Sequence, residues 1–456
     1  MRRREPRPRR SRIRARRRPR HRHRRHRRQC TRRTAPPPPP PPPRPPAGKV
    51  LPVTRAPRLL ITASVPVTLQ TFILPYAAHY RAKGWRVDAA ANGAPDSPDL
   101  AVAFDAVHHI PWTRRPHHPV NLTRAPRALT RLVKRERYDL VHAHDPIAGF
   151  VTRYALRTLR RNGAPRVVYT AHGFHFWEDG TPLGNFLFSS LERQAARWTD
   201  RLIVINDEDE HATRDWPVDV VRMQGIGIDL HRYAPHRVDP GQVTALRREL
   251  AVPPHAPLFT ILAELNPGKR HRDALEALAH CGREDAILAL AGVGPEERPL
   301  RALANDLGIA HRIRWLGWRN DVPTLLQAST ALLLPSEREG MPRCIMEAFA
   351  LERPVIASDI RGSRELVQPS TGILTPIADV GALARAMRRL IDDPEQARRM
   401  GRAGRHALAP YALPRILQAH DRLYADVLGD PSLLDTRPAH ARTASARPAM
   451  LQDAMP

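Results

Sequence analysis

Two glutamates, Glu339 and Glu347, stand eight residues apart where a strand should give way to a helix. The apolar run 331–334 predicts a buried parallel strand, Gly340 permits a sharp turn, and Pro342 favours the start of a helix. A helix N-terminus offers unpaired NH groups to an anion, while carboxylates accept hydrogen bonds from hydroxyl groups. Such a set suits a nucleotide-sugar, which is both phosphorylated and rich in hydroxyls. Spacing alone also fits a solvated helix face.

A histidine and a lysine follow two other predicted strands. His172 comes directly after the strand 166–171, at the carboxyl end where ligands bind in open α/β sheets. A histidine there is often structural, and a metal cluster is a further alternative because three more lie nearby in the sequence: His142, His144 and His175.

Lys269 follows the turn 266–268, which comes after another predicted strand. A cation on such a loop can neutralise the diphosphate of a leaving nucleotide, and the adjacent Arg270 could share that charge. The alternative is an ordinary surface lysine.

Strand and helix patterns alternate along most of the chain. In the first half, strands are predicted at 58–63, 85–91, 139–143, 166–171 and 201–206, with helices at 69–83, 122–136 and 183–198. After the proline-bearing segment 233–257, strands are predicted at 258–264, 286–291, 313–316, 331–334, 355–357 and 372–374, followed by helices at 380–392, 395–407 and 413–428. This alternation predicts an α/β fold with two Rossmann-like domains, and the cleft between them is the default ligand site.

The motif of Glu, seven residues and Glu, followed by Ala-Phe-Ala and by Pro-Val-Ile-Ala-Ser-Asp-Ile-Arg-Gly, resembles the donor-site signature of the retaining glycosyltransferases of family four. The segments 170–176, 225–229 and 263–269 support the resemblance, which spans about residues 58–427. The His-Gly-Phe-His-Phe form is similar to enzymes that build capsular, exopolysaccharide or lipid-linked oligosaccharide chains. The resemblance implies the GT-B fold of two facing Rossmann-like domains, in which a final helix crosses back to the first domain.

The resemblance also implies roles for single residues. His172 would lie against the donor sugar, and Glu339 would contact sugar hydroxyls and developing positive charge, with backbone NH groups around Gly340 and Met341 assisting. Glu347 would bind the ribose. Lys269, with or without Arg270, would hold the diphosphate, because Glu264 stands where many relatives carry an arginine.

We therefore expect a hexosyltransferase that moves a sugar from a nucleotide-sugar, UDP-linked by expectation, to a saccharide or polyprenyl-diphosphate-linked acceptor with retention. No cofactor or metal is expected, since a lysine and a helix dipole can offset the phosphate charge. The expected domains are a tail at 1–57, an acceptor domain at 58–235, a nucleotide-sugar domain at 236–410, a crossover helix at 411–430 and a tail at 431–456.

Charge is distributed unevenly along the chain. The formal net charge is +29, but roughly 22 of the 74 Lys and Arg residues precede Arg58, against the single acid Glu5, so the body carries about +8. The segment 1–57 is predicted to be disordered, an incorrectly assigned start, or an arm for nucleic acid or an anionic membrane. Three scattered cysteines and the lack of a long apolar run predict a cytoplasmic protein, soluble or peripheral at the inner membrane face.

Two other functions compete with this interpretation. A nucleotide-sugar epimerase shares the two-domain plan, but it would lack the complete motif from Glu339 to Glu347. A nucleic-acid-binding protein would use the arginine-rich arm, but the charge there is confined to a removable tail and lacks interleaved aromatic residues, which makes nucleic acid an unlikely partner.

Overall fold

The computed structural model describes residues 55–177 and 180–434, apart from the side chains at 161 and 162. The predictions for segment 1–54 and for residues 435–456 therefore lie outside the described residues. Within the described ranges, no helix combines the length and the apolar composition needed to cross a bilayer.

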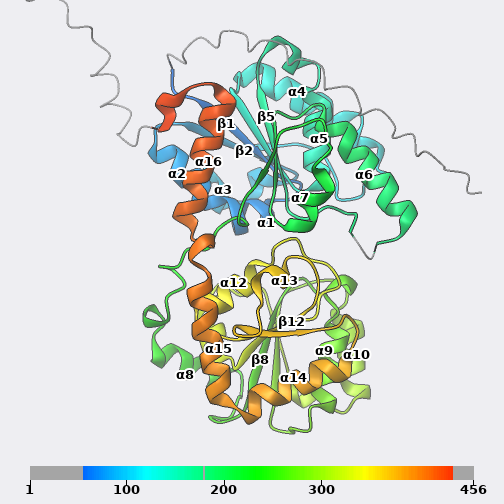
Figure 1. Ribbon diagram of the computed structural model, residues 1–456, viewed down its shortest axis with the longest axis vertical. Coiled ribbons are helices and arrows are strands. Elements are labelled where there is room, and N and C mark those ends of the chain that lie inside the picture. The colour runs from blue at the N-terminus through cyan, green and yellow to red at the C-terminus, as the bar shows by residue number, and fades with distance from the viewer. Residues whose placement is uncertain (1–54, 178–179, 435–456) are drawn as a thin grey trace, which may run out of the picture. The chain divides into compact units, whose positions relative to one another are not determined.

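The first domain is built on a parallel sheet of seven strands in the order β3-β2-β1-β4-β5-β6-β7 (Figure 1). The strands are β1 Arg58–Thr62, β2 Arg86–Ala91, β3 Ala106–His109, β4 Leu140–His144, β5 Arg166–Ala171, β6 Arg201–Val204 and β7 Val220–Arg222. Five of them match predicted strands, whereas β3 and β7 were not predicted. The order reverses at β1, which pairs with both β2 and β4, so a ligand site is expected at the carboxyl ends of these strands.

Helices cover both faces of this sheet (Figure 1). They are α1 Pro66–Thr68, α2 Leu74–Ala82, α3 Pro98–Ala103, α4 Arg124–Glu136, α5 Pro146–Leu156, α6 Pro182–Ala196 and α7 Asp207–Thr213. Leu59 and Ile61 of β1 pack in the core cluster that holds Tyr76 of α2, while Leu60 packs in the cluster that holds Leu129 of α4. Alternate strand residues thus fill two separate cores, as a sheet buried on both faces requires.

The single helix predicted at 69–83 is interrupted. A π-helical segment, Leu69–Ile73, separates α1 from α2. Pro75 lies in the first turn of α2 and has no NH to donate to a preceding carbonyl, so the regular hydrogen-bond ladder restarts there.

The second domain has a parallel sheet of six strands in the order β10-β9-β8-β11-β12-β13. Its strands are β8 Leu258–Leu262, β9 Ile287–Ala291, β10 Ile313–Gly317, β11 Ala331–Leu334, β12 Val355–Ser358 and β13 Gly372–Thr375. Its helices are α8 Pro240–Glu249, α9 His271–His280, α10 Glu297–Asp306, α11 Val322–Ala328, α12 Arg343–Ala350, α13 Ser363–Leu366, α14 Val380–Asp392 and α15 Pro394–Ala407. All six strands were predicted to within two residues. Helix α8 lies in the segment that was interpreted only as a proline-bearing connection.

Short 3₁₀ turns connect these elements at Ala94–Asp96, Pro119–Asn121, Leu159–Asn162, Pro235–Arg237, Pro267–Lys269, Ala310–Arg312, Ala409–Tyr411 and Pro431–Leu434. The last of them lies in the predicted C-terminal tail, yet Leu433 is buried in the same core cluster as Tyr424 and Leu428.

The last helix, α16 (Leu413–Leu428), returns to the first domain. Its Tyr424 hydroxyl lies 2.5 Å from Nδ1 of His142 on β4, and its ring packs 5.0 Å from Tyr80 of α2. On the same helix, Asp421 pairs with Lys83 at 2.7 Å. The α/β fold of two Rossmann-like domains with a crossover helix is confirmed. The exact domain boundaries remain predictions.

Candidate active site

Two glycine-bearing loops meet where the donor motif and the histidine motif had been predicted. A Cβ added to Gly340 would lie 1.8 Å from the carbonyl oxygen of His172, and a Cβ added to Gly173, which has a φ of +113°, would lie 2.8 Å from the Cα of Gly340. Only glycine permits such an approach of two backbones. The loop after β5 and the loop after β11 therefore bring His172 and Glu339 to one place.

Lys269 and Glu339 form an ion pair at this place. The Lys269 Nζ lies 2.6 Å from Glu339 Oε1, and the two side chains are 25% and 13% exposed. Burial lowers the pKa of Lys269, but the Glu339 carboxylate outweighs it and the net shift is upward. Lys269 is therefore a fixed positive charge. Arg270 instead turns to Asp273, at 2.7 Å, so Lys269 is the cation that reaches Glu339.

Glu347 lies on α12 and is held by two neighbours. The Tyr233 hydroxyl donates to its Oε1 at 2.8 Å, and Nε of Arg343 lies 3.0 Å from the same oxygen. Burial raises the pKa of Glu347 against the opposing effect of Arg343. Pro342 is the N-cap of α12 and the helix begins at Arg343, so the predicted helix start is displaced by one residue.

Met341 packs its side chain in the core, whereas its neighbour Gly340 makes a close backbone contact. Its side chain is buried, and its Cγ lies 3.2 Å from the position that a Cβ on Gly225 would occupy. The Met341 side chain thus packs under the loop that begins at Gly225. Only its backbone NH is left as a candidate to face a donor.

His172 is paired with a second histidine. Nδ1 of His144 lies 2.9 Å from Nε2 of His172, and the rings of Phe72 and His172 stack at 6.3 Å. Burial lowers the pKa of His172 to about 4, so the ring is neutral near pH 7. One nitrogen of the pair donates and the other accepts, so the tautomer of His172 is coupled to that of His144.

Sequence reasoning considered His144 and its neighbours only as possible metal ligands. Within the described residues, no group of three or more His, Cys, Asp or Glu side chains is arranged to hold a metal ion. His144 instead continues a buried row: His142 packs 4.2 Å from it, and Nε2 of His142 lies 2.8 Å from the Thr170 hydroxyl. Through Tyr424 this row connects the crossover helix with His172.

Acid is expected to destabilise the folded protein as the pH falls from about 6.5 towards 4. Burial lowers the pKa values of His142, His144, His172 and His420, so in this range the unfolded chain binds more protons than the folded chain. Each such histidine removes about 1.4 kcal/mol of unfolding free energy per pH unit. Burial raises the pKa of Asp145 to about 6, so the folded chain takes up one proton there as the pH falls. This uptake offsets the contribution of about one histidine to the slope.

Urea unfolding at pH 7, 6 and 5 measures this slope. Replacing His420 by Gln should reduce it by about the contribution of one proton. A free energy of unfolding that is constant over this range would contradict the neutral, buried state of the row.

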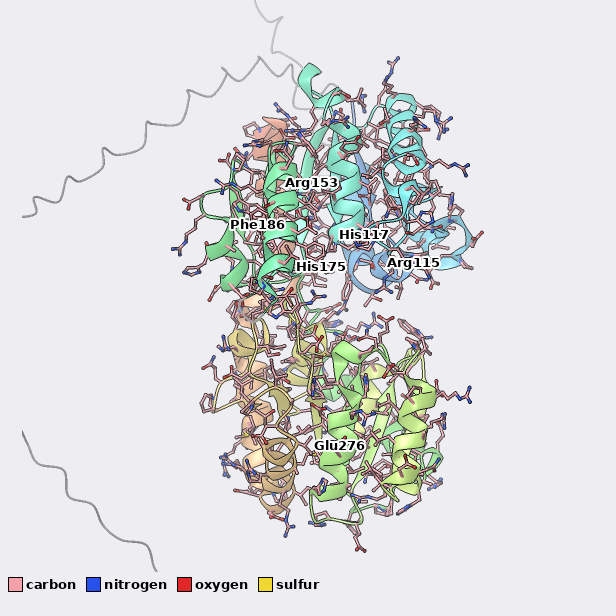
Figure 2. The ribbon with its side chains drawn as sticks, turned by 90° about the vertical axis from the view of Figure 1, so that its right-hand side faces the viewer. Arg115, His117, Arg153, His175, Phe186 and Glu276 are labelled. Carbon is pink, nitrogen blue, oxygen red and sulfur yellow. The ribbon has the colours of Figure 1, made fainter. Side chains whose placement is uncertain are left out.

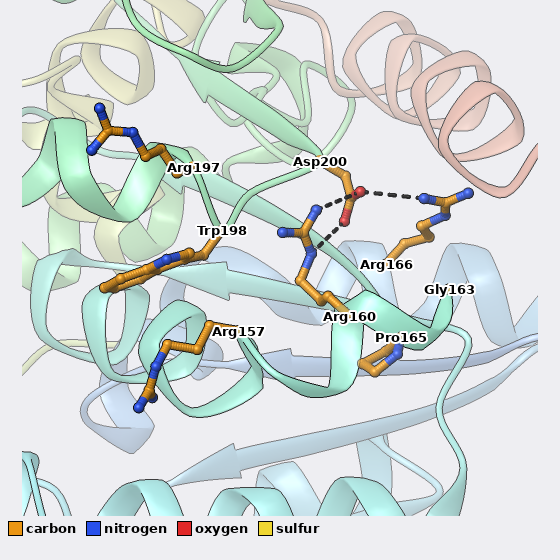
Figure 3. Close-up of a pocket in the computed structure, with 8 residues that line it drawn as sticks. All are labelled: Arg157, Arg160, Gly163, Pro165, Arg166, Arg197, Trp198 and Asp200. Atoms are coloured by element: carbon orange, nitrogen blue, oxygen red, sulfur yellow. Dashed lines mark hydrogen bonds and ion pairs between the residues drawn. The ribbon is translucent and has the colours of Figure 1, made fainter. Parts of the chain in front are cut away.

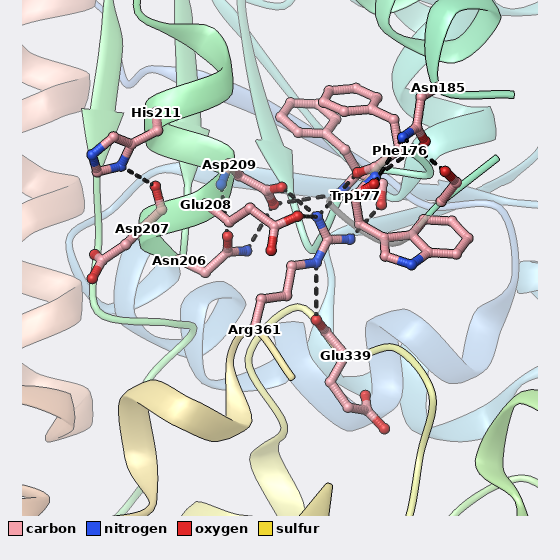
Figure 4. A network of polar contacts seen from close by, with 12 residues as sticks. Phe176, Trp177, Asn185, Asn206, Asp207, Glu208, Asp209, His211, Glu339 and Arg361 are labelled. Carbon is pink, nitrogen blue, oxygen red and sulfur yellow. Dashed lines mark hydrogen bonds and ion pairs between the residues drawn. The ribbon is translucent and has the colours of Figure 1, made fainter. Parts of the chain in front are cut away.

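Arg361 lies in the signature segment after β12 and contacts both α7 and the loop after β5 (Figure 4). Its guanidinium pairs with Asp209 of α7 at 2.7 Å and donates to the carbonyl oxygens of Phe174 and Phe176, the latter at 3.1 Å. Its Nε donates to the backbone oxygen of Glu339 at 3.2 Å. One buried side chain therefore holds the loop after β5 and the backbone of Glu339 in a common arrangement.

Two family models match the chain. The glycosyl transferase 4-like domain matches residues 68–228, and the group 1 glycosyl transferases match residues 242–407. The chain is 33% identical over 375 residues to the putative glycosyltransferase EpsD of Bacillus subtilis, covering 81% of this chain and 96% of that protein. It is also 33% identical over 275 residues to a UDP-Gal:α-D-GlcNAc-diphosphoundecaprenol α-1,3-galactosyltransferase of Escherichia coli, covering 58% of this chain and 70% of that enzyme.

Solved structures share the fold. Anabaena HepE in complex with UDP and glucose has a TM-score of 0.67 and 21% identity, over 81% of this chain and 99% of that one. Sucrose-phosphate synthase of Thermosynechococcus elongatus has a TM-score of 0.69 and 21% identity, over 82% of this chain and 100% of that one. The site and the fold define a two-domain sugar transferase. The chain belongs to the family-four glycosyltransferases of GT-B fold, and the recognition made from the sequence is confirmed.

Proposed function

We propose that this glycosyltransferase moves a hexose from a UDP-sugar, with retention at the anomeric carbon, to a saccharide carried on polyprenyl diphosphate during surface polysaccharide synthesis. The observation that carries the proposal is the convergence of Lys269, Glu339 and His172 at the contact of Gly173 with Gly340. The complexes of HepE with UDP and with UDP-glucose support the choice of nucleotide.

In this proposal, each donor group has a partner among these residues. Lys269 and the NH groups at the start of α12 offset the diphosphate charge, and Glu347, oriented by Tyr233, accepts hydrogen bonds from the ribose hydroxyls. Glu339 accepts from sugar hydroxyls. Lys269 would then share its charge between Glu339 and the diphosphate, so the ion pair keeps the cation in place before the donor arrives.

The reacting groups follow the same geometry. The anomeric carbon would lie beside His172, whose neutral ring can donate or accept a hydrogen bond without adding charge. The bond from this carbon to the diphosphate oxygen breaks, the acceptor oxygen attacks from the same face, and its proton passes to the departing phosphate. Glu339 stabilises the positive charge that develops on the sugar.

The acceptor is expected to approach from the first domain. The loop between β3 and α4 carries four exposed basic side chains, Arg114, Arg115, His117 and His118. Arg115 and His117 lie at the same end of this domain as His175 (Figure 2). Such a loop suits an acceptor diphosphate, and a diphosphoundecaprenol acceptor is named for the Escherichia coli relative. We propose that the enzyme works at the inner face of the plasma membrane, where such acceptors are held.

Replacing Lys269 by Ala is expected to weaken the binding of UDP about tenfold or more and to leave uridine nearly unchanged, because only UDP carries the diphosphate. Glu347→Ala should weaken both ligands, because both contain the ribose. Isothermal titration calorimetry measures the four affinities. Arg270→Ala is the matched control, since that guanidinium is bound to Asp273. Equal losses of UDP and uridine affinity in Lys269→Ala would exclude the diphosphate role.

A further inference from the structure

The turn that carries Lys269 is surrounded by carboxylates. Glu339 pairs with Lys269 itself, and Oε1 of Glu337 lies 3.3 Å from the position that a Cβ on Gly268 would occupy. Burial lowers the pKa of Lys269, whereas both Glu339 and Glu264 raise it, so Glu264 also lies within electrostatic range of this lysine. One lysine therefore lies among three acidic side chains at the place proposed for the donor diphosphate.

The nearby arginines of the second domain offset only part of this negative charge. Arg270 pairs with Asp273 at 2.7 Å. Burial lowers the pKa of Arg338 against the opposing charges of Glu337 and Glu339, so this arginine lies within range of those two carboxylates. Among the described residues, the third carboxylate, which precedes the turn, forms no ion pair with an arginine of its own domain.

Glu264 is paired instead with a cation of the first domain. Nη2 of Arg114 lies 3.7 Å from Oε2 of Glu264, and the two side chains are 66% and 43% exposed. Burial raises the pKa of Asp145, which directly follows β4, and Arg114 is among the groups that oppose this shift. The loop that carries Arg114 thus brings a positive charge near both the carboxyl end of β4 and the residues that follow β8.

This ion pair differs from those that belong to the framework of the first domain. Asp200 lies between Arg160 and Arg166 at 2.6 Å and 3.4 Å (Figure 3), and its side chain is 13% exposed. It also accepts from the backbone NH of Val167 at 2.7 Å. An exposed pair at 3.7 Å contributes little to folding by comparison. Arg114 and Glu264 are therefore available to respond to a charged ligand.

A diphosphate beside Lys269 would bring several negative charges near Glu264. Like charges repel, and the repulsion is stronger in a partly enclosed cleft than in bulk water. A cation held against Glu264 offsets this repulsion. Arg114 is the described arginine that occupies that position.

We infer that Arg114 is a positioning residue of the donor site, which acts through Glu264: by pairing with this carboxylate, it allows the donor diphosphate to bind beside an acidic side chain. The inference rests on the proposed function, which assigns the diphosphate to Lys269. Because Arg114 belongs to the first domain and Glu264 to the second, both domains contribute charge to the donor site. The loop that suits the acceptor thereby also serves the donor.

The test is the binding of UDP and of uridine to the full chain, measured by isothermal titration calorimetry in the absence of acceptor. Arg114→Gln is expected to weaken UDP binding about three- to fivefold and to leave uridine unchanged, because only UDP carries the diphosphate. Adding Glu264→Gln to Arg114→Gln should return the UDP affinity to near that of the wild type, because the repelling carboxylate is then gone. Arg115→Gln is the matched control for UDP affinity, since it removes the same charge from the next exposed residue.

Three results would overturn the inference. One is a UDP affinity that Arg114→Gln leaves unchanged, and another is an equal loss in Arg115→Gln. The third is a double variant that binds UDP as weakly as Arg114→Gln does, because the guanidinium would then act on the diphosphate without Glu264. Failure of the proposed function is distinguishable, since Lys269→Ala would then also bind UDP as the wild type does.

Discussion

Replacing Glu339 by Gln is expected to lower kcat about a hundredfold while leaving the thermal midpoint nearly unchanged. Glutamine keeps the shape and can still accept a hydrogen bond from Lys269, which Glu339 contacts at 2.6 Å. It loses the negative charge that would stabilise the developing charge on the sugar. The effect should therefore appear in turnover rather than in folding or in UDP affinity.

The matched control is Glu337→Gln. Glu337 lies two residues before Glu339 and its side chain is exposed, so this change also removes one negative charge from the loop. A general effect of charge on the loop would lower both activities equally. Near-normal turnover in Glu339→Gln, with the correct donor and acceptor, would remove Glu339 from the catalytic machinery.

Replacing Arg361 by Met is expected to be damaging in two separable ways. The change leaves Asp209 buried without its cation, which should reduce the unfolding free energy by about 3–5 kcal/mol. It also removes the donor that holds the backbone oxygen of Glu339. We expect kcat to fall about tenfold or more, because moving the Glu339 carboxylate by about 1 Å from the sugar lowers the rate of transfer.

A second variant separates these effects. Adding Asp209→Asn to Arg361→Met removes the uncompensated carboxylate, so stability should recover in large part, whereas kcat should not. The control is Arg364→Met, three residues further on, where the guanidinium is 57% exposed and pairs with Asp359 at the surface. Urea unfolding and steady-state kinetics are measured on the wild type, Arg361→Met, the double variant and Arg364→Met. Recovery of kcat in the double variant would show that Arg361 affects activity only through stability.

Buried parallel strands were the elements that could be predicted best from the sequence. Runs such as Ala331–Leu334 are continuously apolar because both faces of the sheet are covered. The missed strands β3 and β7 lie at the two edges of the first sheet, and β3 reads Ala-Val-His-His. An edge strand has one neighbour and needs less burial, so its pattern is weak.

The site could be predicted in part. Glu339, Lys269 and His172 were recognised singly, because each follows a strand in a motif of known type. Their mutual contacts could not be predicted, since Lys269 and Glu339 are 70 residues apart and meet only through the strand order. The sequence offered a weak signal for His144, which follows the motif Val-His-Ala at the end of β4, and it was interpreted as a possible metal ligand.

Other supporting residues gave no signal in the sequence. Tyr233, which orients Glu347, lies in a segment predicted only as a connection between domains. Asp209 belongs to a run of acids at the start of α7 that fits an ordinary helix N-terminus, and nothing in this run distinguishes the buried carboxylate that lies 2.7 Å from Arg361. Long-range partners of this kind are determined by the packing of the two domains.

The most direct test of the proposed function is the anomeric configuration of the product. The purified chain would be incubated with a panel of UDP-hexoses and a polyprenyl-diphosphate-linked monosaccharide, and the new glycosidic linkage would be assigned by proton NMR. We predict acceptor-dependent release of UDP with at least one donor, and an α-linked product from an α-linked donor. A β-linked product would contradict the retaining geometry proposed for His172 and Glu339, and no transfer from any nucleotide-sugar would contradict the donor site itself.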